Sequence, residues 1–201
     1  TCRVLSSADT DPYSAYAGAI GSLKGRKHGG ANHQVLAMQK EIKENVHNWE
    51  DDDEIASYIA KIVNKQAYDK TGLIYGMGHA VYSLSDPRAR VFKGFVEQLS
   101  QEKHREKEFK LMSDVERIAA GLIAKERKIY KGVSANVDFY SGFVYSMLGL
   151  PHELYTPIFA VARISGWSAH RIEELINCGK IIRPAYKSIS PHNEYTPLSE
   201  R

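Results

Sequence analysis

Helical periodicity runs through almost the whole chain and is the feature that most constrains its fold. Apolar residues recur at steps of three or four positions, which is the spacing of one helix face. Two segments show this clearly: Val35, Met38, Ile42, Val46 and then Ile55, Tyr58, Ile59, Ile62. Because no segment alternates apolar and polar residues for long, as a half-buried strand would, we predict an all-α fold of seven to nine helices.

Several helix starts can be predicted from capping residues. Asp86 followed by Pro87 places a carboxylate at the cap and proline at the first helical position. The segment Ser113–Glu116 has the capping-box pattern and predicts a helix start there. Thr156 with the following proline predicts another start. The acidic run Asp51–Glu54 is typical of a first helical turn, where the helix dipole favours negative charge.

Composition and charge limit the class of protein. The chain has 201 residues, and 27 Lys and Arg against 24 Asp and Glu give a net charge of +3, which provides no basis for a nucleic-acid partner. The two cysteines, Cys2 and Cys178, suit a reduced compartment, so we expect a cytoplasmic protein. Apolar runs are far shorter than the roughly 18 residues needed to cross a bilayer, so we expect no membrane partner.

Two glycine-flanked histidines and one aspartate are candidates for chemistry. His28 and His79 lie in glycine-containing segments that interrupt the helical pattern, where the backbone can approach a ligand closely. Asp138 lies between apolar residues, and burial would raise its pKa and make it a usable base. Each histidine alone is typical of a helix end, and a metal site of His28, His79 and Asp138 is a further alternative. Together the three favour one shared site.

Three arginines in defined contexts extend this candidate site. Arg88 follows the Asp-Pro cap, Arg163 lies on an apolar helix face, and Arg183 precedes a proline. A guanidinium on an apolar face needs a partner, which is either an internal carboxylate or a substrate carboxylate bound by two hydrogen bonds. Three arginines beside two histidines and an aspartate indicate a small polyanionic substrate.

The motifs around these residues resemble those of the citrate synthase family, in its C-terminal half. The resemblance runs from about Ser14 to Tyr195. It depends on six motifs in the family's order: HGGAN at 28–32, GMGHAVY at 76–82, DPR at 86–88, NVDFYSG at 136–142, RISGW at 163–167 and RP at 183–184. Several independent motifs in register make an accidental likeness very improbable.

The resemblance implies a role for each candidate residue. His28 matches the histidine that binds the thioester oxygen of acetyl-CoA, and Asp138 matches the base that takes the methyl proton. His79 matches the histidine that polarises the ketone of oxaloacetate. Arg88, Arg163 and Arg183 match the arginines that bind its carboxylates, the last in the neighbouring subunit of a homodimer. The implied activity is that of an acyltransferase of the tricarboxylic acid cycle, with acetyl-CoA as co-substrate and without a cofactor or metal.

The resemblance also implies how the chain is divided into domains. Residues 1–28 and 144–201 match pieces of the large domain, and residues 29–143 match the small domain. The family's first substrate histidine lies upstream of HGGAN, and nothing in this chain matches it. We therefore expect the N-terminal half to be absent and the isolated chain to be inactive.

Two alternatives to citrate synthase stay open at this stage. A 2-methylcitrate synthase, which uses propionyl-CoA, needs the same residues, and one methylene is worth only about 1 to 3 kcal/mol of discrimination. The other alternative belongs to a different class, namely a non-catalytic helical fragment or CoA-binding module.

Overall fold

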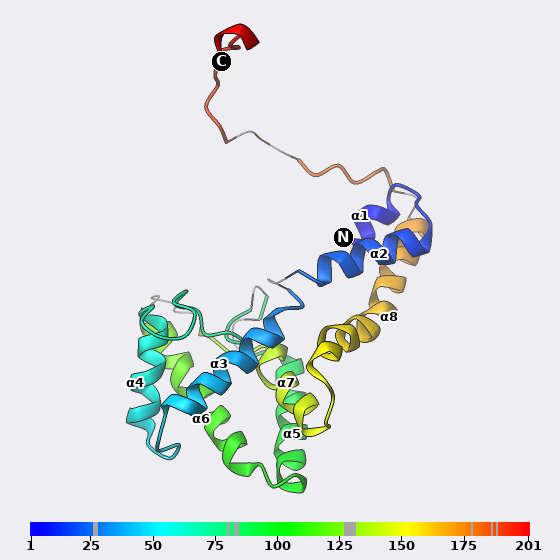
Figure 1. Cartoon of the computed structure of the whole chain (residues 1–201). Helices are drawn as coiled ribbons and strands as arrows, with labels where there is room; N and C mark the ends of the chain where they lie inside the picture. Colours follow the sequence, from blue (N-terminus) through cyan, green and yellow to red (C-terminus); the bar gives the residue numbers. More distant parts are fainter. Residues whose placement is uncertain are drawn as a thin grey trace.

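The computed structural model describes residues 1–25, 28–79, 81–82, 85–126, 132–177, 179–185, 187 and 189–201. Within these residues the chain forms eight α-helices, two short 3-10 turns and no β-strand (Figure 1). The helices are α1 (Cys2–Ser6), α2 (Pro12–Leu23), α3 (Ala31–Asn45), α4 (Asp52–Val63), α5 (Pro87–Glu102), α6 (Glu106–Glu126), α7 (Val137–Met147) and α8 (Tyr155–Ile176). The predicted all-α fold is confirmed. None of the described helices is long and apolar enough to cross a membrane.

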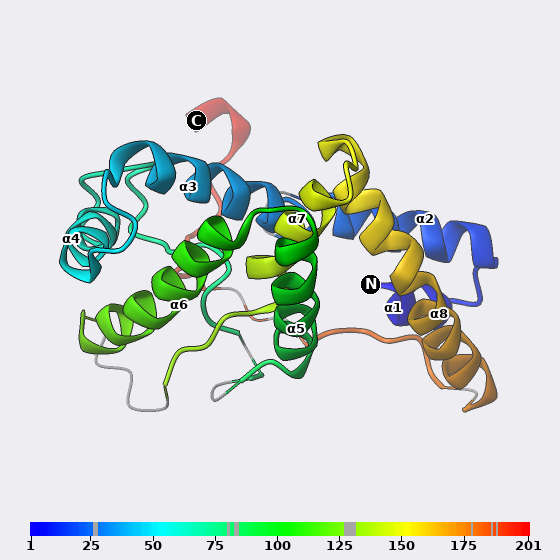
Figure 2. The same ribbon diagram turned by 90° about the horizontal axis from the view of Figure 1, so that it is seen from below.

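The helices form two groups with separate apolar cores (Figures 1 and 2). Helices α3 to α7 pack around a large core to which every one of them contributes buried side chains. Its largest fully buried members on α7 are Phe139, Tyr140 and Phe143. Helices α1, α2 and α8 form the second group around a smaller core of Cys2, Ala15 and Ala19. Cys178 lies outside the described residues.

Two predicted helix starts agree with the structure, and a third lies within one turn of the observed start. Asp86 caps α5 by accepting a hydrogen bond from the backbone N–H of Arg88, and Pro87 is the first residue of that helix. Asp51 caps α4, and the remaining acidic residues of the run fill the first turn. Helix α8 begins at Tyr155, so Thr156 lies in its first turn. Local capping chemistry therefore identified the starts of α4 and α5 and came within a turn of the start of α8.

The helix start predicted at Ser113 is wrong. Helix α6 begins at Glu106 and runs through Ser113 without interruption. Leu111, Val115 and Ala119 are buried on one face of this helix, four residues apart. This apolar stripe continues the helix past the serine, because burial of a whole face outweighs one local cap.

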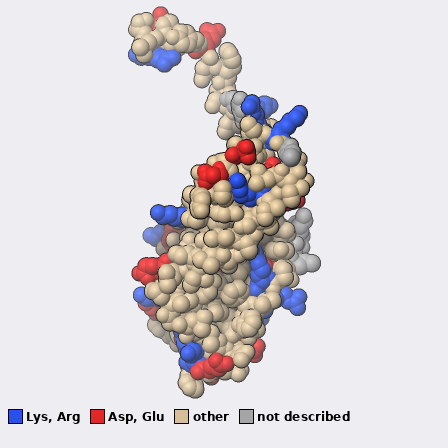
Figure 3. Space-filling view, turned by 90° about the vertical axis from the view of Figure 1, so that its right-hand side faces the viewer, with Lys and Arg blue, Asp and Glu red and all other residues tan. Residues whose placement is uncertain are grey.

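An apolar surface remains exposed on the second group of helices. On α8, the side chains of Val161, Leu175 and Ile176 are 71%, 41% and 72% exposed. Figure 3 views the molecule from the side on which α8 lies in Figure 1 and shows a broad face with few charged residues. An exposed apolar area of this kind is typical of a surface that contacts another molecule.

Candidate active site

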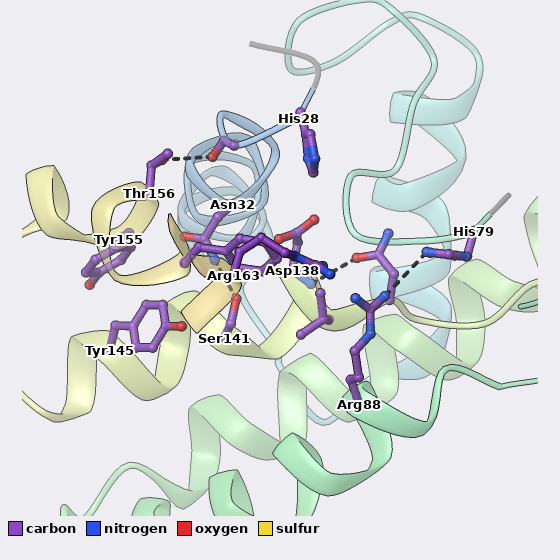
Figure 4. Close-up of a pocket in the computed structure, with 14 residues that line it drawn as sticks. His28, Asn32, His79, Arg88, Asp138, Ser141, Tyr145, Tyr155, Thr156 and Arg163 are labelled. Atoms are coloured by element: carbon purple, nitrogen blue, oxygen red, sulfur yellow. Dashed lines mark hydrogen bonds between the residues drawn. The ribbon is translucent and has the colours of Figure 1, made fainter. Parts of the chain in front are cut away.

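A cavity of about 230 Å³ lies where the first turns of α3, α5, α7 and α8 meet the segment around His79 (Figure 4). Five of the six residues that the sequence singled out line this cavity, although they come from five separate parts of the chain: His28, His79, Arg88, Asp138 and Arg163. The sixth, Arg183, lies in an exposed segment after α8 and does not line the cavity. The fold therefore brings together both histidines, the aspartate and two of the three arginines.

Asp138 is the second residue of α7, directly after the capping residue Asn136 and Val137. Burial raises the pKa of the Asp138 carboxyl above its ordinary value of 3.8, and the nearby side chains of His28 and Arg88 oppose part of this rise. A carboxylate with a raised pKa is a stronger base than an exposed aspartate. Asp138 can therefore accept a proton from a weakly acidic group that is held within hydrogen-bond reach.

The hydrogen bonds of His79 define which of its ring nitrogens carries the proton. Nδ1 of His79 accepts from the backbone N–H groups of Val81 at 3.0 Å and Tyr82 at 3.2 Å. An Nδ1 that accepts hydrogen bonds has no proton, so the neutral ring carries its proton on Nε2. Nε2 lies 3.4 Å from Nη2 of Arg88, and both line the cavity; because a guanidinium only donates, the two N–H groups of this tautomer do not bond to each other. One ligand oxygen between them can accept a hydrogen bond from each.

Asp86 holds Arg88 in place through its own cap position. The Asp86 side chain is fully buried and accepts hydrogen bonds from Nε of Arg88 at 3.1 Å and from Nη2 at 2.9 Å. Burial alone would raise the pKa of Asp86, but the hydrogen bonds from Arg88 outweigh it and lower that pKa. The guanidinium is therefore oriented before any ligand binds, which reduces the entropy lost on binding.

His28 lies in the turn before α3, and a close contact with α8 fixes this turn. The hydroxyl of Thr156 donates to the backbone carbonyl of Gly29 at 3.0 Å. A Cβ atom at Gly29 would lie 2.5 Å from the carbonyl oxygen of Leu23 and 2.6 Å from a side-chain carbon of Thr156. Only glycine fits at this crossing of chains, so the residue after His28 is set by packing.

Arg163 reaches the cavity from α8. Among the described residues it forms no salt bridge, and its guanidinium lies 5.9 Å from the centre of the Phe159 ring. The internal carboxylate that the sequence left open as its partner is thus not found in the described part of the chain. An exposed guanidinium at a cavity wall is suited to bind an anionic ligand.

No metal site is formed by these side chains. Within the described ranges, no three His, Cys, Asp or Glu residues are placed to hold a metal ion, although His28, His79 and Asp138 line one cavity. The cavity instead presents a buried base, two imidazoles and two guanidinium groups. Such a set is suited to remove a proton from an acyl compound while it binds carboxylates.

Comparison with known proteins decides the family. Residues 1–185 match the family described as citrate synthase, C-terminal domain. The chain belongs to the citrate synthase family. It is 39% identical to the citrate synthase of Synechocystis sp. over its whole length, which is 46% of that protein. It is 34% identical to 2-methylcitrate synthase 1 of Corynebacterium glutamicum, again over its whole length and 48% of the relative.

Solved structures give the same family. The citrate synthase of Thermoplasma acidophilum, solved as a ternary complex with carboxymethyl coenzyme A and oxaloacetate, matches the whole chain with a TM-score of 0.76 and 31% identity. The match covers 49% of that protein. The citrate synthase of Thermotoga maritima matches with a TM-score of 0.74 and 33% identity. The chain thus spans about half the length of the citrate synthases that it matches.

Sequence reasoning missed part of the cavity wall of this citrate synthase family member. Asn32 and Ser141 belong to two of the motifs without a predicted role, yet Nδ2 of Asn32 donates to Oγ of Ser141 at 2.6 Å and connects α3 to α7. Tyr145, Tyr155 and Phe159 also line the cavity, and no sequence pattern marked them. Burial raises the pKa of the Tyr145 hydroxyl, and the negative charge of Asp138 adds to this rise, so the tyrosine lies within the field of the base.

Proposed function

We propose that the protein containing this chain is a citrate synthase, an acyltransferase that condenses acetyl-CoA with oxaloacetate and water to give citrate and CoA. The convergence of His28, His79, Arg88, Asp138 and Arg163 on one cavity carries this proposal. Membership of the citrate synthase family supports it, as does the likeness to the Thermoplasma enzyme in complex with a CoA analogue and oxaloacetate.

In the first step, Asp138 takes a proton from the methyl group of acetyl-CoA. The raised pKa of Asp138 favours this transfer, because its conjugate acid is then less acidic than an ordinary aspartic acid. His28 donates a hydrogen bond to the thioester oxygen, on which negative charge develops as the proton leaves. Stabilising that oxygen is what makes a weakly acidic methyl group reactive.

In the second step, the carbon of the resulting enolate attacks the ketone carbon of oxaloacetate. His79 donates from Nε2 to the ketone oxygen, while Arg88, whose Nη2 lies 3.4 Å from that Nε2 in the same cavity, holds a neighbouring carboxylate of oxaloacetate. The new C–C bond converts the ketone oxygen to an alkoxide, which takes the proton from Nε2 of His79. The proton that Asp138 removed from the methyl group then replaces it, so both residues return to their starting protonation states. Water then hydrolyses the thioester of citryl-CoA and releases citrate and CoA.

The arginines select a dicarboxylate and connect the site to the assembly. We assign Arg88 and Arg163 to the carboxylates of oxaloacetate, since both guanidinium groups reach the cavity. We assign Arg183 to the site of a neighbouring subunit in a homodimer, which is consistent with its exposed position away from its own cavity. We propose a small domain at residues 29–143 and large-domain pieces at residues 1–28 and 144–201. The separate cores of α3–α7 and of α1, α2 and α8 support two domains, although Val144 and Met147 at the end of α7 pack in the first core.

The remaining assignments follow from this activity. We propose a cytoplasmic enzyme of the tricarboxylic acid cycle that uses acetyl-CoA as co-substrate and needs no further cofactor. A second candidate is 2-methylcitrate synthase, which the 34% identity to the Corynebacterium glutamicum enzyme supports. We further propose that the 201-residue chain alone is inactive, because the relatives have about twice its length.

The test is a spectrophotometric assay of CoA release by the complete gene product that contains this chain. We expect oxaloacetate-dependent release from acetyl-CoA that exceeds release from propionyl-CoA and survives exhaustive chelation. A preference for propionyl-CoA would favour the second candidate. Metal-dependent turnover, or none with either acyl-CoA, would refute the assignment. Turnover by the 201-residue chain alone would refute its proposed inactivity.

A further inference from the structure

A short pairing of two chain segments connects the His79 segment to the start of α7. The backbone N–H of Gly78 donates to the carbonyl of Ser134 at 2.7 Å, and the N–H of Asn136 donates to the carbonyl of Gly76 at 2.8 Å. Met77 and Ala135 form an isolated antiparallel bridge between these two bonds. His79 directly follows one segment of this pairing, and α7 with Asp138 directly follows the other.

The side chain of Asn136 adds two further bonds at the same place. Its Oδ1 accepts from the backbone N–H of Asp138 at 3.0 Å, and this bond caps α7. Its Nδ2 donates to the carbonyl of Gly78 at 2.9 Å. A single carboxamide, itself part of the cavity wall, thus contacts the backbone of Asp138 and the residue before His79.

Asparagine meets both geometric demands of this position. The cap needs an acceptor on a short side chain, and the carbonyl of Gly78 needs a donor at the opposite corner of the same planar group. Aspartate keeps the cap but would place an oxygen against the carbonyl oxygen of Gly78. Serine keeps a cap acceptor but carries one polar atom and cannot reach both partners.

We propose that Asn136 is a positioning residue that fixes the distance between His79 and Asp138. This inference rests on the proposed function, in which Asp138 removes a proton from one substrate while His79 activates the other. The two reacting carbons meet only if both side chains hold their places, and a misplacement of about 1 Å can cost about 100-fold in rate. Asn136 itself touches backbone, so it acts through these two residues.

The kinetic test compares Asn136→Ser and Asn136→Asp with a matched cap variant, Asp51→Ser. Asp51 caps α4 by accepting from the N–H groups of Asp53 and Glu54, and it does not line the cavity. For both Asn136 variants we expect kcat to fall about 10- to 100-fold, with KM for oxaloacetate changed less than threefold. Asp51→Ser should leave kcat within twofold at a similar change in urea stability. Equal kcat in Asn136→Ser and wild type would overturn the proposal.

A second measurement needs no activity. The 201-residue chain is labelled with 15N-histidine, and the NMR chemical shifts of the ring nitrogens of His79 report which nitrogen is protonated. The His79 signals are identified as those lost in His79→Gln. We expect the Nε2–H form to dominate in wild type and to decrease in Asn136→Ser, because the turn that aims Val81 and Tyr82 at Nδ1 loses its anchor. Unchanged shifts would overturn the positioning role. If the His79 shifts change in Asn136→Ser but the complete wild-type gene product is inactive, the proposed citrate synthase function is refuted while the positioning role of Asn136 stands.

Discussion

The ion cluster around Glu108 allows the effect of one substitution to be worked out from the structure. The Glu108 carboxylate accepts from Nε of Arg105 at 2.6 Å and from Nη2 of Arg105 at 2.9 Å, and it also pairs with Nζ of Lys43. Arg105 donates in addition to Oγ of Ser146 on α7. The cluster therefore joins α3, α6 and α7.

The pKa of Glu108 gives the size of the effect. Burial would raise this pKa, but the hydrogen bonds from Arg105 and Lys43 lower it from 4.5 to about 2. At 1.36 kcal/mol per pKa unit, this difference corresponds to about 3 kcal/mol of stability for the ionised carboxylate. The Glu108 side chain is 22% exposed, so solvent screens part of this value and we expect about 2 to 3 kcal/mol.

The sign of the pH dependence follows from the direction of the shift. Because the pKa of folded Glu108 lies below the unfolded value, its contribution is complete above about pH 4.5 and is lost as the pH falls toward 2. For Glu108→Gln, urea unfolding followed by circular dichroism should show a free energy of unfolding about 2 to 3 kcal/mol below wild type at pH 7. This difference should shrink steadily between pH 4.5 and pH 3.

Glu50→Gln is the matched control, since Glu50 pairs with Lys110 of the same helix α6 at 3.9 Å with both side chains more than half exposed. This control should change stability by less than about 0.5 kcal/mol. A Glu108→Gln difference that is the same at pH 7 and pH 3 would show that packing, and not charge, carries the effect. No difference at pH 7 would refute the reasoning outright.

Three further predictions concern the cavity and its surroundings. Asp138→Asn should lower kcat by about 10²- to 10⁴-fold, and near-normal turnover of this variant would make Asp138 structural. Because the pKa of Asp138 is raised, the wild-type rate should fall on the acid side at a pH above 3.8, the pKa of an ordinary aspartate. Arg163→Leu should raise KM for oxaloacetate at least tenfold without changing the urea midpoint, whereas unfolding with an unchanged KM would point to a structural role. Gly76→Ala should lower the free energy of unfolding by about 1 to 3 kcal/mol more than Gly78→Ala. Both glycines have positive φ, but only at Gly76 would a Cβ meet the backbone of Phe139, at 2.9 Å, so equal losses would exclude that clash.

Local chemistry explains which helices could be predicted from the sequence. The starts of α4 and α5 depend on Asp51 and Asp86, whose side chains bind N–H groups within three residues. Such bonds need no distant partner, so sequence spacing reveals them. Ser113 has the same local pattern, but the helix continues through it because one face of α6 is buried. That burial depends on helices far away in the chain.

The candidate site shows the same division. The residues with reactive side chains could be selected from motifs, because their types are unusual in glycine-rich or apolar surroundings. The other residues of the cavity wall could not be predicted. Tyr145, Tyr155 and Phe159 look like ordinary core residues in the sequence, and they line the cavity only because α7 and α8 come together there. The two hydrogen bonds of the Asn136 side chain also depend on a pairing between residues 76–78 and 134–136, which are far apart in the chain.

The contact between Gly29 and Thr156 has a mechanical consequence. It lies where the chain passes from α2 into α3 and where α8 begins, so both covalent connections between the two helix groups come together at one point. A rotation of one group against the other would pivot at this contact, and atoms farther from the pivot would travel farther. The opening of the cavity would then be governed by a hinge that has no room for even one additional methyl group.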